Sequence, residues 1–167
     1  MVMNLTKKHT VESIADLLKQ VKDPEIPTIS LIDLGVITNI DIADNQHVLI
    51  KMTPTFAGCP AMDYMKKNVE EVLLENGIES YDVEMNFDTQ WTSNNITDEG
   101  LKAINKHGLA PPPQHNLIID IDLIGQARCP YCNSTDTTLK SPFGPTLCRS
   151  MHYCNSCFQA FEQFKPV

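Results

Sequence analysis

The stretches Cys129-Pro130-Tyr131-Cys132 and Cys154-Asn155-Ser156-Cys157 decide how the end of this chain folds. Each is a Cys-x2-Cys knuckle, and 21 residues separate the two. Two residues between the sulfurs let both point at one ion from a tight turn, and a second knuckle completes a tetrahedral shell. The spacing therefore predicts a closed, structural site in which Cys129, Cys132, Cys154 and Cys157 hold one zinc ion per chain.

Two alternatives remain open for these four cysteines: a pair of disulfides, or iron bound singly or as a cluster. The start of the sequence lacks the apolar centre of a signal peptide, so we expect a cytoplasmic, reducing compartment that disfavours disulfides. No stretch is long and apolar enough to predict a membrane span. So short a C-terminal segment can hardly bury a core unaided, whereas metal binding contributes on the order of 10 kcal/mol to folding.

Two further residues near the second knuckle belong to neither knuckle. We expect Cys148 to be a buried or spare thiol and His152 to be a surface residue.

Hydrophobic patterns upstream predict a small α/β (α+β) domain with a three-stranded sheet and flanking helices, followed by the zinc-ribbon module. We expect this domain over residues 1–110, a Pro-rich linker with a connecting strand over 111–126, and the ribbon over 127–167. The expected elements, in chain order, are a helix over 10–21, a hairpin of strands over 36–42 and 48–52, a helix over 61–76, a strand over 81–87 and a helix from Thr97 to His107.

The net charge of −8 is unevenly placed, because 19 of the 21 acidic residues precede residue 128. An acidic domain repels phosphate backbones, so nucleic acid is an unfavourable main partner. A zinc-ribbon nucleic-acid binder is the weakest alternative function.

A sixth cysteine, Cys59, lies in the loop 53–60 between a strand and a helix. The pattern predicts Cys59 at the N-cap with Pro60 as the first helical residue. Free helix N–H groups would then lower the pKa of the thiol and make it a better ligand, although Asp63 opposes this. The alternative is a small buried cysteine that has only a packing role.

The same loop contains residues that would support Cys59. Gly58 lets the backbone expose the sulfur, and the hydroxyls of Thr53 and Thr55 lie nearby in the sequence. One thiolate cannot hold a cluster that needs four, so other ligands must come from a second copy in a homodimer, a client protein or a small thiol. A catalytic Cys/His pair is an alternative, with His47 as its nearest candidate.

Three carboxylates, Asp23, Glu25 and Asp33, cluster in proline-bounded turns. We expect them to cap local structure rather than to form an acid/base pair.

The segments 23–27, 33–35 and 53–61 together resemble the MIP18 (DUF59) family. The segments 91–92, 108–112, 129–132, 143–148 and 154–165 extend the likeness to the D subunits of phenylacetyl-CoA epoxidase systems. The resemblance implies a non-catalytic protein that helps to assemble iron or iron-sulfur centres, in either the diiron oxygenase subunit or its flavin/[2Fe-2S] reductase. It also implies that Cys59 is the functional cysteine and transient ligand, and that Cys148 fits the family pattern.

The chain has neither a pair of Glu-x-x-His motifs nor a glycine-rich dinucleotide loop, so we expect it not to be an enzyme. The alternatives to maturation are a structural adaptor of the oxygenase complex and a general iron-sulfur carrier.

Overall fold

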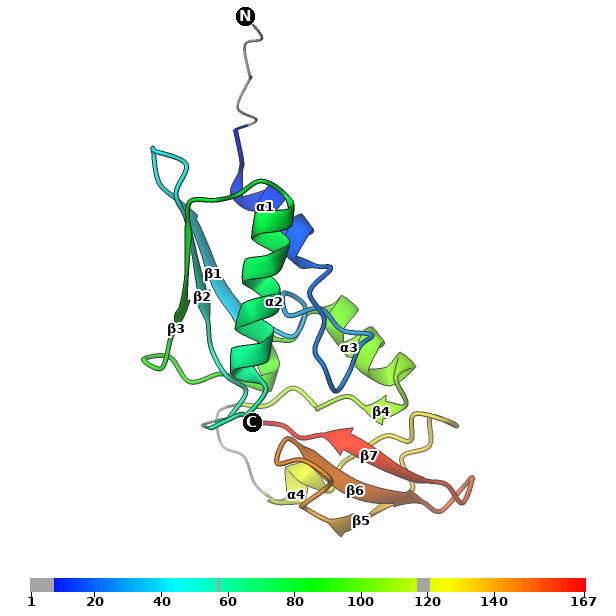
Figure 1. The fold of residues 1–167 in the computed structure, drawn as a ribbon. Coiled ribbons are helices and arrows are strands. Elements are labelled where there is room, and N and C mark those ends of the chain that lie inside the picture. Colours follow the sequence, from blue (N-terminus) through cyan, green and yellow to red (C-terminus); the bar gives the residue numbers. More distant parts are fainter. Residues whose placement is uncertain (1–7, 57, 117–120) are drawn as a thin grey trace, which may run out of the picture.

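The structure is a computed structural model that describes residues 8–56, 58–116 and 121–167. Its N-terminal domain contains a sheet of strand order β1-β2-β3. Strands β1 (Ile37–Ile42) and β2 (Val48–Met52) form an antiparallel hairpin, and β3 (Tyr81–Met85) lies parallel to β2. Helices α1 (Val11–Leu18) and α2 (Met62–Glu75) cover one face of this sheet (Figure 1). The predicted three-stranded sheet with flanking helices is confirmed.

Local capping sets the helix starts in this domain. Thr10 and Ser13 form a capping box at the start of α1, in which each side chain accepts from the backbone of the other. Thr97 caps α3 (Asp98–Lys106) by accepting from the backbone N–H of Gly100. Helix α1 ends three residues before the predicted position, because the N–H of Val21 closes a tight turn on the carbonyl of Leu18.

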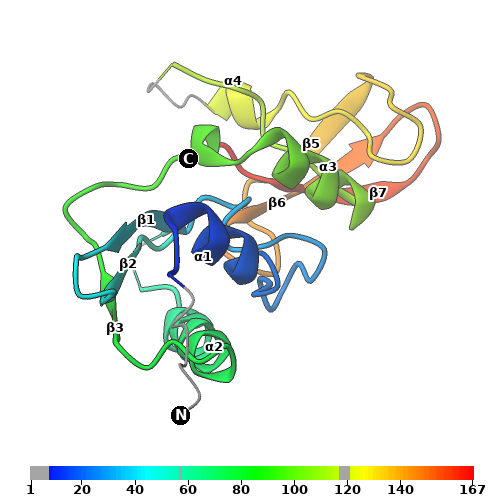
Figure 2. The same cartoon turned by 90° about the horizontal axis from the view of Figure 1, so that it is seen from above.

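The C-terminal sheet has the order β4-β7-β6-β5. Its strands are β4 (Leu109–Ala110), β5 (Thr137–Ser141), β6 (Arg149–Cys154) and β7 (Ala160–Phe164), with β4 parallel to β7. Helix α3 contacts β4 of this sheet and lies between α1 and the sheet in Figure 1, whereas from above it overlaps the strands (Figure 2). We refer below to the N-terminal domain and to the ribbon (residues 121–167).

The connection between the two modules differs from the prediction. Residues 111–116 are irregular, as expected for the three prolines, but the expected connecting strand is wrong for 121–124, which form helix α4 (Ile121–Ile124). Residues 117–120 of the predicted linker and connecting strand lie outside the described residues. A short apolar run does not distinguish helix from strand by its periodicity, which explains the error. Residues 109–110, assigned by sequence to the first domain, pair with β7 of the ribbon.

The ribbon packs directly on the N-terminal domain. Phe164 of β7 is buried in the main core and makes an edge-to-face contact with Trp91, with ring centroids 6.0 Å apart. The indole N–H of Trp91 donates to the carbonyl of Leu34 at 3.1 Å, so the same ring also anchors the loop before β1. The N–H of Ser93 donates to the carbonyl of Val167 at 2.9 Å. The two modules therefore share one core across their interface.

Within the described part of the chain, no helix is long and apolar enough to cross a membrane.

Candidate functional site

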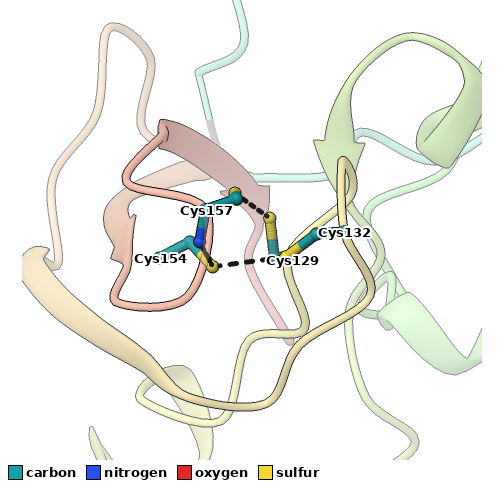
Figure 3. Close-up of side chains that lie close together, drawn as sticks. All are labelled: Cys129, Cys132, Cys154 and Cys157. Carbon is teal, nitrogen blue, oxygen red and sulfur yellow. Dashed lines mark hydrogen bonds between the residues drawn. The ribbon is translucent and has the colours of Figure 1, made fainter.

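The sulfurs of the two knuckles meet at one point of the ribbon (Figure 3). Cys129 and Cys132 come from the loop before β5, Cys154 ends β6, and Cys157 lies in the turn between β6 and β7. All four Sγ atoms lie within 4.8 Å of one another. Sγ of Cys129 is 3.7 Å from that of Cys157, and Sγ of Cys132 is 3.5 Å from that of Cys154.

These distances fit a tetrahedral metal site. Four sulfurs bound to zinc at about 2.3 Å form a tetrahedron with edges of about 3.8 Å, which matches the observed 3.5 and 3.7 Å. A disulfide requires about 2.05 Å, so the predicted alternative of two disulfides is not the arrangement in this structure. The donor set is four thiols with no open position, as expected for a structural ion.

The knuckles reach this geometry through their own backbone. Each is closed by a residue with positive φ, Asn133 at 63° and Phe158 at 62°. The N–H of Asn133 donates to the carbonyl of Cys129 at 2.9 Å, and that of Phe158 to the carbonyl of Cys154 at 3.0 Å. Two matching turns therefore present the sulfurs, as their spacing predicts.

The pKa values of the four thiols and the repulsion between their charged forms also favour binding of a cation. The backbone N–H of Cys157, together with that of Ser156, lowers the pKa of Cys154 to about 6. Burial raises the pKa of Cys157 to about 12, and the neighbouring sulfurs add to this effect. Four thiolates this close repel one another, so all four deprotonate together only around a positive ion.

His152 is buried, and the prediction of a surface residue is wrong. Its Nε2 lies 3.0 Å from the hydroxyl of Ser150, and its ring stacks on Phe161 with centroids 5.4 Å apart. Strand β6 alternates between partly exposed and buried positions, which places Ser150, His152 and Cys154 on the inner face. Burial lowers the pKa of His152. The residue supports the ribbon from within.

Cys59 lies outside helix α2. The helix begins at Met62 and its N-cap is Ala61, so the prediction of Cys59 as N-cap is wrong. The N–H of Met62 donates to the carbonyl of Cys59 at 3.3 Å and forms an extra turn before the helix. Gly58 has φ +80° with open space where a Cβ would lie, so the glycine is needed for its backbone angle.

The expected acidic thiol at Cys59 is also wrong. Burial raises the pKa of Cys59, and the negative charges of Asp23 and Glu25 raise it further. The backbone N–H groups of Ala61 and Met62 act in the opposite direction but do not reverse the shift. The thiol is therefore protonated near neutral pH, because it is half-buried and faces two carboxylates.

Cys59 opens into a cavity of about 380 Å³ between the two modules, which we call the interface cavity. The lining residues that carry chemistry are Asp23, Glu25, Thr55 and Cys59 from the N-terminal domain and Thr146 and Cys148 from the ribbon. Gly58 and Phe164 also line it. Cys59 and Cys148 were expected in separate modules with no contact predicted between them, and the one sequence signal that pointed to Cys148 was its fit to the family pattern.

Of the residues predicted to support Cys59, two line the interface cavity and one does not. Thr55 and Gly58 are among its lining residues. Thr53 is buried, its N–H donates to the carbonyl of Val36 at 2.8 Å, and its hydroxyl lies 3.3 Å from that of Thr38. Thr53 therefore joins the loop to β1.

Two of the three clustered carboxylates have the predicted structural role. Oδ1 of Asp23 accepts from the N–H groups of Glu25 and Ile26 at 2.9 and 2.8 Å, which closes the proline-bounded turn. Asp33 accepts from the hydroxyl of Thr97 at 3.0 Å.

The alternative Cys59–His47 pair is not formed. The ring of His47 contacts Ser80 at 2.9 Å and Asp82 at 3.1 Å, beside the start of β3.

Two family matches divide the chain in nearly the same way as the structure. Residues 12–84 match the family described as "Iron-sulfur cluster assembly protein", and residues 121–165 match the "PaaD zinc beta ribbon domain". The first match covers nearly all of the three-stranded sheet and helices α1 and α2 but ends before α3, and the second covers the four-cysteine cluster.

Relatives are similar over the whole chain or over its first domain. The Escherichia coli K12 protein named as the D component of a "Putative 1,2-phenylacetyl-CoA epoxidase" is 36% identical over 157 residues, covering 94% of this chain and 93% of that protein. A "Fe-S protein maturation auxiliary factor" of Porphyromonas gingivalis is 32% identical over 100 residues, covering 59% of this chain and 94% of its own length.

Solved structures resemble the N-terminal domain. A conserved hypothetical protein of Thermotoga maritima is 30% identical, with a TM-score of 0.51, covering 59% of this chain and 96% of that one. A DUF59 domain from Bacillus anthracis has a TM-score of 0.52 at 23% identity, covering 56% of this chain and 89% of that one, and shows the shared fold alone.

Proposed function

This chain belongs to the iron-sulfur cluster assembly protein family and carries the PaaD zinc β-ribbon domain, and from that membership we propose that it is a maturation factor. It assists the assembly of iron or iron-sulfur centres in an oxygenase system of the phenylacetyl-CoA epoxidase type. The client is the diiron oxygenase subunit or its flavin/[2Fe-2S] reductase. The chain itself is not the catalyst of the oxygenation.

The observation that carries this proposal is the position of Cys59 in the interface cavity. A half-buried thiol beside two carboxylates is a poor nucleophile near neutral pH, because its pKa is raised. An incoming thiophilic metal reverses that balance, since it displaces the thiol proton and is attracted by the same carboxylates. The site is therefore better suited to receiving a cation than to covalent catalysis.

The ribbon ion is separate from the cargo. We propose that Cys129, Cys132, Cys154 and Cys157 hold zinc permanently, because four sulfurs within 4.8 Å of one another would leave a bound ion no open position. Zinc there supplies folding free energy and no reaction chemistry. Iron bound at Cys59 during delivery is the substrate of the maturation step.

Replacing Cys59 by serine tests this function. The Cys59→Ser chain is produced together with the oxygenase and reductase subunits, which are then purified anaerobically and assayed for iron, labile sulfide and activity. We expect unchanged zinc in the variant chain but iron-deficient client. Leu74→Ser is the matched control, because Leu74 is 52% exposed on α2 and lies outside the cavity lining.

A fully metallated, active client from cells that contain only the Cys59→Ser chain would overturn the proposal. If that variant also remained in a stoichiometric complex with the active oxygenase, the structural-adaptor function would replace maturation.

A further inference from the structure

The interface cavity brings together two thiols that are distant in the sequence and belong to different modules. Cys59 precedes α2 in the N-terminal domain, and Cys148 lies at the end of the β5–β6 loop in the ribbon. Both are free and half-buried, and both line the same space of about 380 Å³. Neither thiol belongs to the four-cysteine cluster of the ribbon.

Cys148 is held in place by its own loop. Its carbonyl accepts from the N–H of Lys165 at 2.8 Å, and its Sγ lies 3.1 Å from the hydroxyl of Thr146. The loop is closed by the N–H of Gly144, which donates to the carbonyl of Arg149 at 2.9 Å. The thiol is thus fixed toward the cavity by a well-bonded loop.

The neighbouring residue locks this loop onto the other module. Arg149 makes an ion pair with Glu25 at 3.5 Å and another with Glu162 at 2.9 Å, and it also donates to the backbone carbonyl of Glu25 at 3.3 Å. The side chain of Arg149 is only 12% exposed. Glu25 and Cys148 are therefore positioned together, although one comes from each module.

The same two carboxylates act on both thiols. Burial, followed by the charges of Asp23 and Glu25, raises the pKa of Cys59. For Cys148, burial again raises the pKa most, and Glu25 and Asp23 add to it against the opposing effects of Thr146 and Arg149. Both thiols therefore lie within electrostatic range of one pair of carboxylates, which places all four groups around one space.

We propose that Cys59 and Cys148 jointly bind the iron cargo in the interface cavity, with the carboxylates of Asp23 and Glu25 attracting the incoming cation before the thiols lose their protons. This inference rests on the proposed maturation function and adds the second ligand to it. For ferrous iron, two S–H bonds are replaced by two Fe–S bonds, two protons pass to water, and the iron keeps its oxidation state. Two thiols with nearby carboxylates suit a borderline cation such as ferrous iron, or iron within a cluster.

The arrangement suits transfer rather than permanent storage. Among the described residues, only the ribbon cysteines place three or more ligand atoms close enough for a preformed cage. An iron held by two thiolates keeps coordination positions for the client's own ligands, whereas a four-thiolate shell is closed. Cys148 also gives the ribbon a role beside the N-terminal domain, because the ribbon supplies a thiol ligand that the N-terminal domain lacks.

Cobalt(II) is the probe that counts the thiolate ligands. Zinc-loaded chain is titrated anaerobically with Co²⁺, and the near-ultraviolet sulfur-to-cobalt charge-transfer band is measured together with retained zinc. The band intensity rises with the number of Co–S bonds. We expect about half the wild-type intensity for Cys59→Ser and for Cys148→Ser, none for the double variant, and the full value for Leu74→Ser. One zinc per chain in every variant shows that the ribbon is intact.

Two parallel incubations distinguish whether the cavity binds iron as a single ion or as a cluster. Wild-type chain is incubated anaerobically with ferrous iron alone, or with ferric iron, a small thiol and sulfide, then desalted and assayed. Iron retained without sulfide indicates the ion, and iron retained only together with labile sulfide indicates a cluster.

Full wild-type intensity in Cys148→Ser would overturn the joint site while leaving the role of Cys59 intact. Absence of any band in the wild type would also overturn it. The maturation function fails by a different result, a fully metallated client from the Cys59→Ser cells.

Discussion

Arg149 of the ribbon and Glu25 of the N-terminal domain form an ion pair at 3.5 Å across the module interface, beside the cavity that contains Cys59 and Cys148. The guanidinium group also pairs with Glu162 at 2.9 Å, so one side chain joins β6, β7 and the turn after α1. Its exposed fraction is 12%, which protects these contacts from full solvent screening.

Arg149→Ala should loosen the ribbon from the N-terminal domain. Loss of charged hydrogen bonds in a mostly buried place costs about 1.5–3 kcal/mol in the free energy of unfolding. Arg149→Lys should recover only part of the lost stability, because a single ammonium group cannot reproduce the contacts of the guanidinium group with both Glu25 and Glu162. Urea denaturation measures both. Lys67→Ala, in an exposed i,i+4 pair on α2, is the control and should change stability by less than about 0.5 kcal/mol. Equal stability of Arg149→Ala and wild type would contradict this assignment.

Zinc removal should change the fluorescence of Trp91. The chain has one tryptophan, and its ring contacts Phe164 of β7 at 6.0 Å. Zinc supplies on the order of 10 kcal/mol to the folding of such a module, so chelation should unfold the ribbon and withdraw Phe164 from the core. A red-shifted emission that is restored by added zinc is the expected result. An unchanged spectrum after complete zinc loss would show that β7 holds its place without the metal.

Phe164→Ala should destabilise both modules together. The side chain is 2% exposed and belongs to the main core, so its truncation should cost about 3–5 kcal/mol. A single, earlier denaturation transition is expected, because the two modules share this residue. Phe87→Ala is the control, since Phe87 is 73% exposed. Two separate transitions in the wild type would instead indicate independent modules.

Alkylation by iodoacetamide should show the effect of the carboxylates on the two cavity thiols. In zinc-loaded protein, Cys59 and Cys148 should react slowly near pH 7, because the pKa of each thiol is raised. Their alkylation should become faster only above about pH 8.5, the ordinary pKa of a cysteine thiol. Glu25→Gln removes a negative charge, so both pKa values fall and alkylation at pH 8 becomes faster. Peptide mass spectrometry measures each rate. The exposed Glu79→Gln is the control, and a slower reaction in Glu25→Gln would reverse the assigned sign.

The sequence by itself determined the elements whose cause is local. Thr10 and Thr97 cap helices where their side chains reach backbone N–H groups three residues ahead, and the two Cys-x2-Cys turns present their sulfurs through short-range backbone bonds. The hydrophobic pattern likewise predicted the hairpin of β1 and β2. These features depend on interactions between residues a few positions apart, so they can be predicted from the sequence alone.

Tertiary structure alone decided the properties that depend on what packs against a residue. Cys59 was expected to have a lowered pKa from the helix terminus, but burial and the carboxylates of Asp23 and Glu25 raise it. His152 was expected at the surface, but it is buried where its ring stacks on Phe161 of the neighbouring strand β7. Cys148 reaches the same cavity as Cys59 only because the ribbon docks through Phe164 and Arg149. Burial and charge proximity are set by contacts between residues far apart in the chain, and no local pattern records them.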